Sequence, residues 1–67
     1  MGAANFAPEV IRVLRQAGFR FVQQANGSHE LWFAPRVRKT VAVPSTIKML
    51  HTAQKILFEA GLKKHFF

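Results

Sequence analysis

The sequence predicts an α+β domain in which a helix, three strands and a second helix follow one another along the chain. Two segments, one toward each end, repeat apolar residues at helical spacing. Three short segments between them are rich in β-branched and aromatic residues, and turn-forming residues separate them. Two amphipathic helices and one sheet bury their apolar sides most simply when both helices cover the same face of the sheet.

The first helix is predicted within residues 7–19, which read APEVIRVLRQAGF, and it is about three turns long. Pro8 suits a first helical turn, and Gly18 suits the position just beyond a helix end. The spacing of the apolar residues predicts a buried helix face made by Val10, Ile11, Leu14 and Ala17.

The three strands are predicted in residues 20–25, 29–34 and 39–43. Asn26-Gly27 is typical of a two-residue type I′ turn, which requires positive φ at both positions. Pro35 to Arg38 forms the second connection. The short connections predict an antiparallel meander.

A two-residue turn at Asn26-Gly27 places Phe21 opposite Trp32 and Gln24 opposite His29. Phe21 and Trp32 are then expected on the face away from the helices, as a surface for a protein partner. The side chains expected on the core side of the sheet are those of Val22, Leu31, Phe33, Val41 and Val43.

The second helix is predicted within residues 47–62, after a cap at Ser45 or Thr46 and with Gly61 as its stop. Its buried face is predicted to contain Ile47, Leu50, Ala53, Leu57 and Ala60. The letters LRQAGF near the first helix end resemble LFEAGL near the second. This similarity indicates that both helices end by the same chemistry.

With 67 residues, the chain has room for a single small domain. Ten lysines and arginines against three glutamates leave a net charge of +7, which favours nucleic acid, or an acidic protein that mimics it, as the partner. The sequence has no cysteine, no apolar run long enough for a membrane span and no export signal. We therefore expect a cytoplasmic protein that does not bind membranes.

His29, which follows a Gly-Ser turn and starts a strand, is the candidate catalytic residue. Histidine exchanges a proton near neutral pH, and RNA supplies its own nucleophile, the 2′-hydroxyl. Three glutamates are too few for a two-metal nuclease, and His29, His51 and His65 lack the spacing of a zinc site. We expect neither a metal nor a cofactor.

The candidate substrate-binding residues are polar or basic. Arg36, Arg38, Lys39 and Lys48 are expected to form a phosphate-binding rim beside His29, and Ser28 is counted with them.

Three stretches of the sequence form a recognisable pattern: VIRVLRQAGFRFVQQANGSHELWF, then TVAVP, then the closing AGL. Its most specific motifs are Ala17-Gly18-Phe19, Gly27-Ser28-His29 and Val43-Pro44. By these residues, the chain from Val10 to Leu62 resembles the HicA family of toxins, which are mRNA interferases.

This resemblance implies a fold like that of double-stranded-RNA-binding domains, with metal-independent cleavage of mRNA by His29. It also implies neutralisation by a HicB-type antitoxin and no DNA binding by the chain alone. Residues 1–67 are expected to form one domain, with residues 1–5 as a flexible extension outside the match. Two alternatives stay open: a non-catalytic RNA-binding module of this fold, and a degenerate toxin that only binds its antitoxin.

Overall fold

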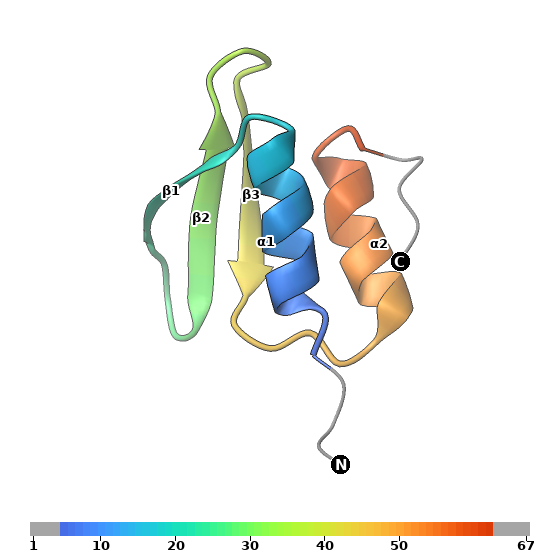
Figure 1. Ribbon diagram of the computed structural model, residues 1–67. Coiled ribbons are helices and arrows are strands. Elements are labelled where there is room, and N and C mark those ends of the chain that lie inside the picture. Colours follow the sequence, from blue (N-terminus) through green and yellow to red (C-terminus); the bar gives the residue numbers. More distant parts are fainter. Residues whose placement is uncertain (1–4, 63–67) are drawn as a thin grey trace.

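The computed structural model describes residues 5–62 and has the predicted order of elements (Figure 1). The α-β-β-β-α prediction is therefore confirmed. The elements are α1 (Ala7–Gln16), β1 (Arg20–Gln24), β2 (His29–Ala34), β3 (Lys39–Pro44) and α2 (Leu50–Glu59).

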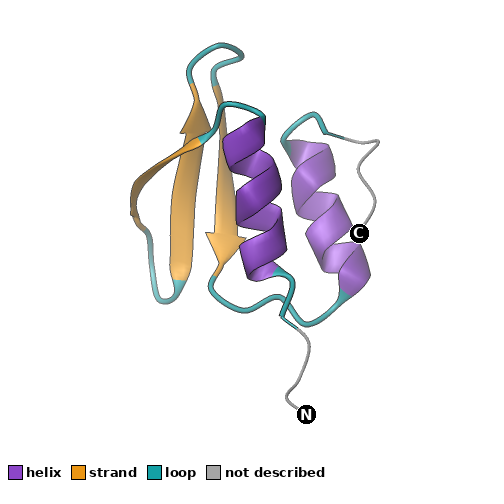
Figure 2. Ribbon diagram, in the orientation of Figure 1, coloured by secondary structure: helices purple, strands orange, loops and turns teal. Residues whose placement is uncertain are grey.

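The three strands form one antiparallel sheet in the order β1-β2-β3, and the two helices lie together beside it (Figure 2). Both helices contact β3 and each other. The buried side chains of the sheet all belong to one face, so both helices cover the same face, as predicted. In the part of the chain that the structure describes, neither helix has the length and apolar character to cross a membrane.

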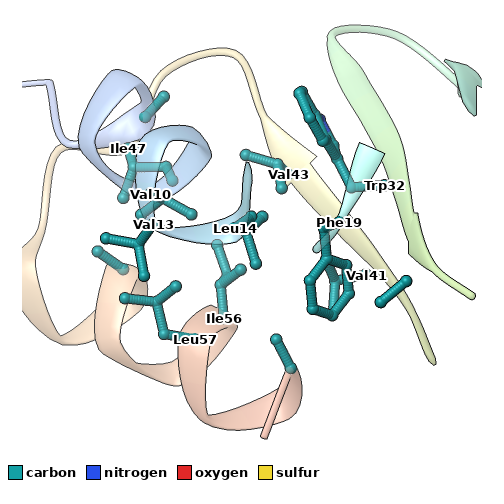
Figure 3. Close-up of a cluster of buried hydrophobic side chains, with 14 residues drawn as sticks. Val10, Val13, Leu14, Phe19, Trp32, Val41, Val43, Ile47, Ile56 and Leu57 are labelled. Carbon is teal, nitrogen blue, oxygen red and sulfur yellow. The ribbon is translucent and has the colours of Figure 1, made fainter. Parts of the chain in front are cut away.

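The hydrophobic core lies between the helices and this face of the sheet (Figure 3). Leu14, Val43 and Leu57 are almost completely buried at its centre. Figure 3 shows Phe19 and Trp32 pointing into the core from the β1 and β2 side. Ala17 and Leu50, which the helical pattern placed on buried faces, are exposed.

Both helices end at a glycine with positive φ, +95° at Gly18 and +86° at Gly61. The N–H of Phe19 donates to the carbonyl of Leu14 at 2.9 Å, and the N–H of Leu62 donates to that of Leu57 at 2.8 Å. These bonds satisfy carbonyl groups that a helix end leaves unpaired. The repeated letters LRQAGF and LFEAGL therefore do encode the same helix ending.

The start of α2 differs from the prediction. The helix begins at Leu50, and neither Ser45 nor Thr46 caps it. Residues 45–49 instead form an irregular connection whose one buried side chain is Ile47. The need to seat Ile47 in the core overrides the local capping signal.

Asn5 ties this connection to the start of α1. Its Oδ1 accepts hydrogen bonds from the N–H groups of Ala7 and Ile47, each at 3.0 Å. The N–H of Phe6 also donates to the carbonyl of Ile47 at 2.7 Å. Asn5, expected in a flexible extension, is thus part of the folded domain. Residues 1–4 lie outside the described part.

The predicted faces of the sheet are wrong for β2. Trp32 is 2% exposed and lies against the helices, opposite Val41, whereas Leu31 and Phe33 alternate to the other face. Val41 and Val43 are buried as predicted, and Val22 is 51% exposed. Four consecutive apolar residues in β2 fit either phase of the strand alternation, so the local pattern could not decide between the two faces.

Candidate nucleic-acid interface and catalytic histidine

The turn before His29 is longer than the predicted two-residue turn. The N–H of Ala25 donates to the carbonyl of His29 at 2.8 Å, so residues 26–28 form the loop. Gly27 has a φ of +61°, which glycine adopts without strain. A bulge between Phe21 and Gln23 absorbs the extra loop residue, so Phe21 still lies opposite Trp32 as predicted.

The backbone of His29 is held on both sides. It pairs with Pro44 of β3, and its N–H donates to the carbonyl of Asn26 at 3.3 Å. The neighbouring Ser28 carbonyl accepts the N–H of Ser45 at 2.9 Å. The side chain of His29 is exposed, so a fixed backbone presents the imidazole to solvent.

The strand alternation places His29 on the same face as Leu31 and Phe33, away from the helices. Ser28 and Lys48 belong to the segments at this end of the sheet. Ser28 immediately precedes β2, and Lys48 lies in the connection that starts at Ser45, which is hydrogen-bonded to Ser28.

Arg36, Arg38 and Lys39 do not lie beside His29. They belong to the β2–β3 turn and the start of β3, at the opposite end of the sheet (Figure 1). Five residue steps along β2 separate His29 from Ala34, which corresponds to roughly 17 Å. The prediction of a phosphate-binding rim of four cations beside His29 is therefore wrong.

Lys39 lies at the far end of the helix-covered face. It pairs with the buried Ala34, and its Cε would lie 3.7 Å from a Cβ atom at Gly61. A cation near the C-terminal end of α2 interacts favourably with the partial negative charge of that end. Lys39 is thus close to the end of α2, a position that the sequence did not indicate.

Arg38 is the one non-glycine residue with positive φ among residues 5–62, at +55°. Its N–H donates to the carbonyl of Ala34 at 2.8 Å and closes the β2–β3 turn. The left-handed region costs an ordinary side chain about 1–2 kcal/mol. The chain therefore carries an arginine at a position where glycine would be less strained.

We expect Arg38→Gly to separate stability from RNA binding. Glycine relieves the backbone strain, so the midpoint of thermal unfolding should stay equal or rise. Loss of the guanidinium should weaken RNA binding if Arg38 contacts phosphate. Thermal unfolding and RNA titration of the same sample measure both effects. Unchanged RNA affinity at every salt concentration would show that Arg38 makes no phosphate contact.

The expected aromatic partner surface does not form, because Phe21 is on the surface and Trp32 is in the core. Phe21 is 49% exposed, but Trp32 is buried and donates its indole N–H to Oε1 of Glu30 at 3.1 Å. The Phe21 and Trp32 rings meet edge to face at 5.9 Å, and the Arg15 guanidinium lies 5.2 Å from the Trp32 ring centroid. Trp32 is a core residue and offers no docking surface.

The acidic residues are scattered. Glu9 on α1 pairs with Arg12, Glu30 on β2 accepts the Trp32 hydrogen bond, and Glu59 ends α2. Within residues 5–62, no three His, Cys, Asp or Glu side chains come together as a metal site. His51 is exposed on α2, and His65 lies outside the described residues.

A comparison with protein families matches residues 7–62 to the family described as HicA toxin of bacterial toxin-antitoxin. A search of curated proteins and a search of solved structures found no match. The family match spans both helices and all three strands, including Gly27-Ser28-His29. The chain therefore belongs to the HicA family, the toxins of bacterial toxin-antitoxin systems.

Proposed function

We propose that this chain is a toxin that cleaves mRNA, with His29 as its catalytic residue and without a metal ion. Membership of the HicA family supports an RNA target and an antitoxin partner. The observation that carries the proposal is the placement of His29. Its imidazole is exposed at the start of β2, on a backbone fixed by hydrogen bonds to both sides of the turn.

The reaction proposed is attack of the substrate's 2′-hydroxyl oxygen on the adjacent phosphorus. A 2′-oxygen to phosphorus bond forms, the bond from phosphorus to the 5′-oxygen of the next nucleotide breaks, and a 2′,3′-cyclic phosphate results. The 2′-hydroxyl loses a proton and the leaving 5′-oxygen gains one. His29 carries out one of these transfers as general base or general acid, and water exchanges the other proton.

Negative charge accumulates on the phosphate oxygens as the new bond forms. Positively charged groups and hydrogen-bond donors near the phosphate stabilise that charge. Ser28 directly precedes His29, and Lys48 lies in the connection that starts at Ser45, whose N–H donates to the Ser28 carbonyl. We assign them to the reacting phosphate, whereas Arg36 and Arg38 contact RNA farther away.

RNA cleavage is expected to persist in EDTA and to leave 2′,3′-cyclic phosphate ends. The reason is that His29 and the 2′-hydroxyl supply the proton transfers and the nucleophile, so no metal-bound water is required. Incubation of a single-stranded RNA with and without EDTA, followed by mass analysis of the fragment ends, measures both expectations. Loss of cleavage in EDTA with recovery on addition of magnesium would contradict the metal-independent mechanism.

The antitoxin partner is proposed to be a HicB-type protein with an acidic contact surface. The net charge of +7 on 67 residues supports an acidic partner, because complementary charge speeds association and selects the correct partner. An antitoxin that covers His29 and Lys48 blocks access of RNA to the reacting end of the sheet.

A further inference from the structure

The sheet face turned away from the helices is not covered by either helix, since both pack on the opposite face. We call it the open face. It contains two partly exposed apolar side chains in line with His29 along β2. Its members in the strand register are Arg20, Gln23, His29, Leu31, Phe33, Thr40, Ala42 and Pro44.

No acidic side chain of this protein belongs to the open face. Glu30 alternates to the helix-covered face and is hydrogen-bonded to Trp32. Glu9 and Glu59 are on the two helices. These are the only acidic residues of the chain, so the open face itself carries no negative side chain.

Cations lie at the Phe33 end of the open face. Arg20 is exposed and pairs directly with Phe33 across the β1–β2 ladder. Arg36 and Arg38 follow in the exposed β2–β3 turn, beyond the Phe33 end. An aromatic ring beside an arginine, in a surface without acidic groups, suits a nucleic-acid base and its phosphate.

We propose that the open face binds single-stranded RNA, with one base stacked on Phe33 and a neighbouring phosphate at Arg20. An unpaired base exposes its ring to a flat protein surface, whereas the bases of a duplex are stacked on each other. This inference rests on the proposed function, because the RNA bound on the open face is the same RNA molecule that His29 cleaves.

The path also accounts for the cations that are remote from His29. Phe33 is four residue steps from His29, or roughly 13 Å. A strand with its cleaved phosphate at His29 therefore reaches Phe33 with a base farther along the chain. The same strand then continues toward Arg36 and Arg38, which contact phosphates that are not cleaved.

The experiment measures binding without cleavage. The probe is a fluorescently labelled single-stranded 2′-O-methyl RNA, which lacks the free 2′-hydroxyl that attacks, so unmodified protein can be titrated. Phe33→Leu removes the ring and keeps an apolar side chain. It should weaken binding about 5- to 150-fold, the effect of losing one stacked base. Phe33→Tyr keeps a ring and should retain binding.

The matched control is Phe58→Leu. Phe58 is 62% exposed on α2, on the helix side of the molecule, so this change should leave RNA affinity unaltered. Arg20→Gln tests the phosphate contact and should reduce the slope of log affinity against log salt by about 0.7. Its control, Arg12→Gln, removes the same charge from α1 and should leave that slope nearly unchanged.

Three results would overturn the inference. The first is equal affinity of Phe33→Leu and Phe58→Leu, and the second is an equal loss by Phe33→Leu for single-stranded and duplex RNA. The third is a Phe33→Leu protein that no longer binds the antitoxin but still binds RNA fully, because the open face would then be a binding surface for a protein. Should Phe33→Leu not fold, as judged by circular dichroism, the salt slope of Arg20→Gln decides. Cleavage tested separately on ordinary RNA distinguishes failure of the catalytic proposal from failure of this one.

Discussion

His29→Ala is expected to lower the rate of RNA cleavage by about 10²–10⁴-fold, the usual effect of removing a positioned general acid or base. The fold should persist, because the His29 side chain is exposed and its structural hydrogen bonds come from the backbone. Fragment formation from a labelled single-stranded RNA gives the rate, and the far-ultraviolet circular dichroism spectrum reports the fold.

His51→Ala is the matched control, since His51 is also an exposed histidine but lies on α2. It should cleave RNA at the wild-type rate. Folded His29→Ala protein with unchanged cleavage would remove His29 from the mechanism. Wild-type protein that binds RNA without cutting it would favour the RNA-binding module, and one that binds only the antitoxin would favour the degenerate toxin.

Trp32→Ala is expected to lower the free energy of unfolding by about 3–5 kcal/mol, as other large-to-small changes in cores do. Trp32 is 2% exposed and fills the space between β2 and the helices. Its loss also removes the hydrogen bond to Glu30 and the contact with Arg15. A domain of this size has about 3–10 kcal/mol of total stability, so the variant should be largely or marginally unfolded. Urea unfolding followed by circular dichroism measures the change.

Phe58→Ala serves as the comparison for Trp32→Ala, because Phe58 is an aromatic residue that is 62% exposed. Its effect on unfolding should be within about 0.5 kcal/mol. Equal, small effects at both positions would contradict the burial of Trp32. Because Trp32→Ala disturbs the whole fold, a loss of antitoxin binding in this variant says nothing about docking. Phe21, which is 49% exposed, is the proper surface position to change.

Signals contained in short stretches of sequence predicted the elements of this fold. The endings at Gly18 and Gly61 depend on hydrogen bonds within each helix end, so the letters alone sufficed. The Pro35 to Arg38 connection was also predicted, and it fixes Ala34 opposite Lys39. Counting back along the ladder places Trp32 opposite Val41. This count, applied to the sequence, puts Trp32 and Val41 on one face and so conflicts with the expectation of a buried Val41 and an exposed Trp32, but it does not decide which face the helices cover.

The site was predicted in part. Gly27-Ser28-His29 identified a turn that presents a histidine at a strand start, because turn chemistry is local. The positions of the cations were predicted wrongly, because residues at the two ends of one strand are close in sequence but far apart in space. Arg36 is only seven residues after His29, yet the extended strand between them carries it to the other end of the sheet.

The sequence by itself determined the order α-β-β-β-α, the helix endings, the strong positive charge and the family-typical Gly-Ser-His turn. Only the tertiary structure decided that Trp32 enters the core and that Ile47 is buried in the segment where a helix start was predicted. The physical reason is that β2 is apolar on both faces. Its orientation depends on which side chains the two helices can bury, and that choice involves residues from every part of the chain.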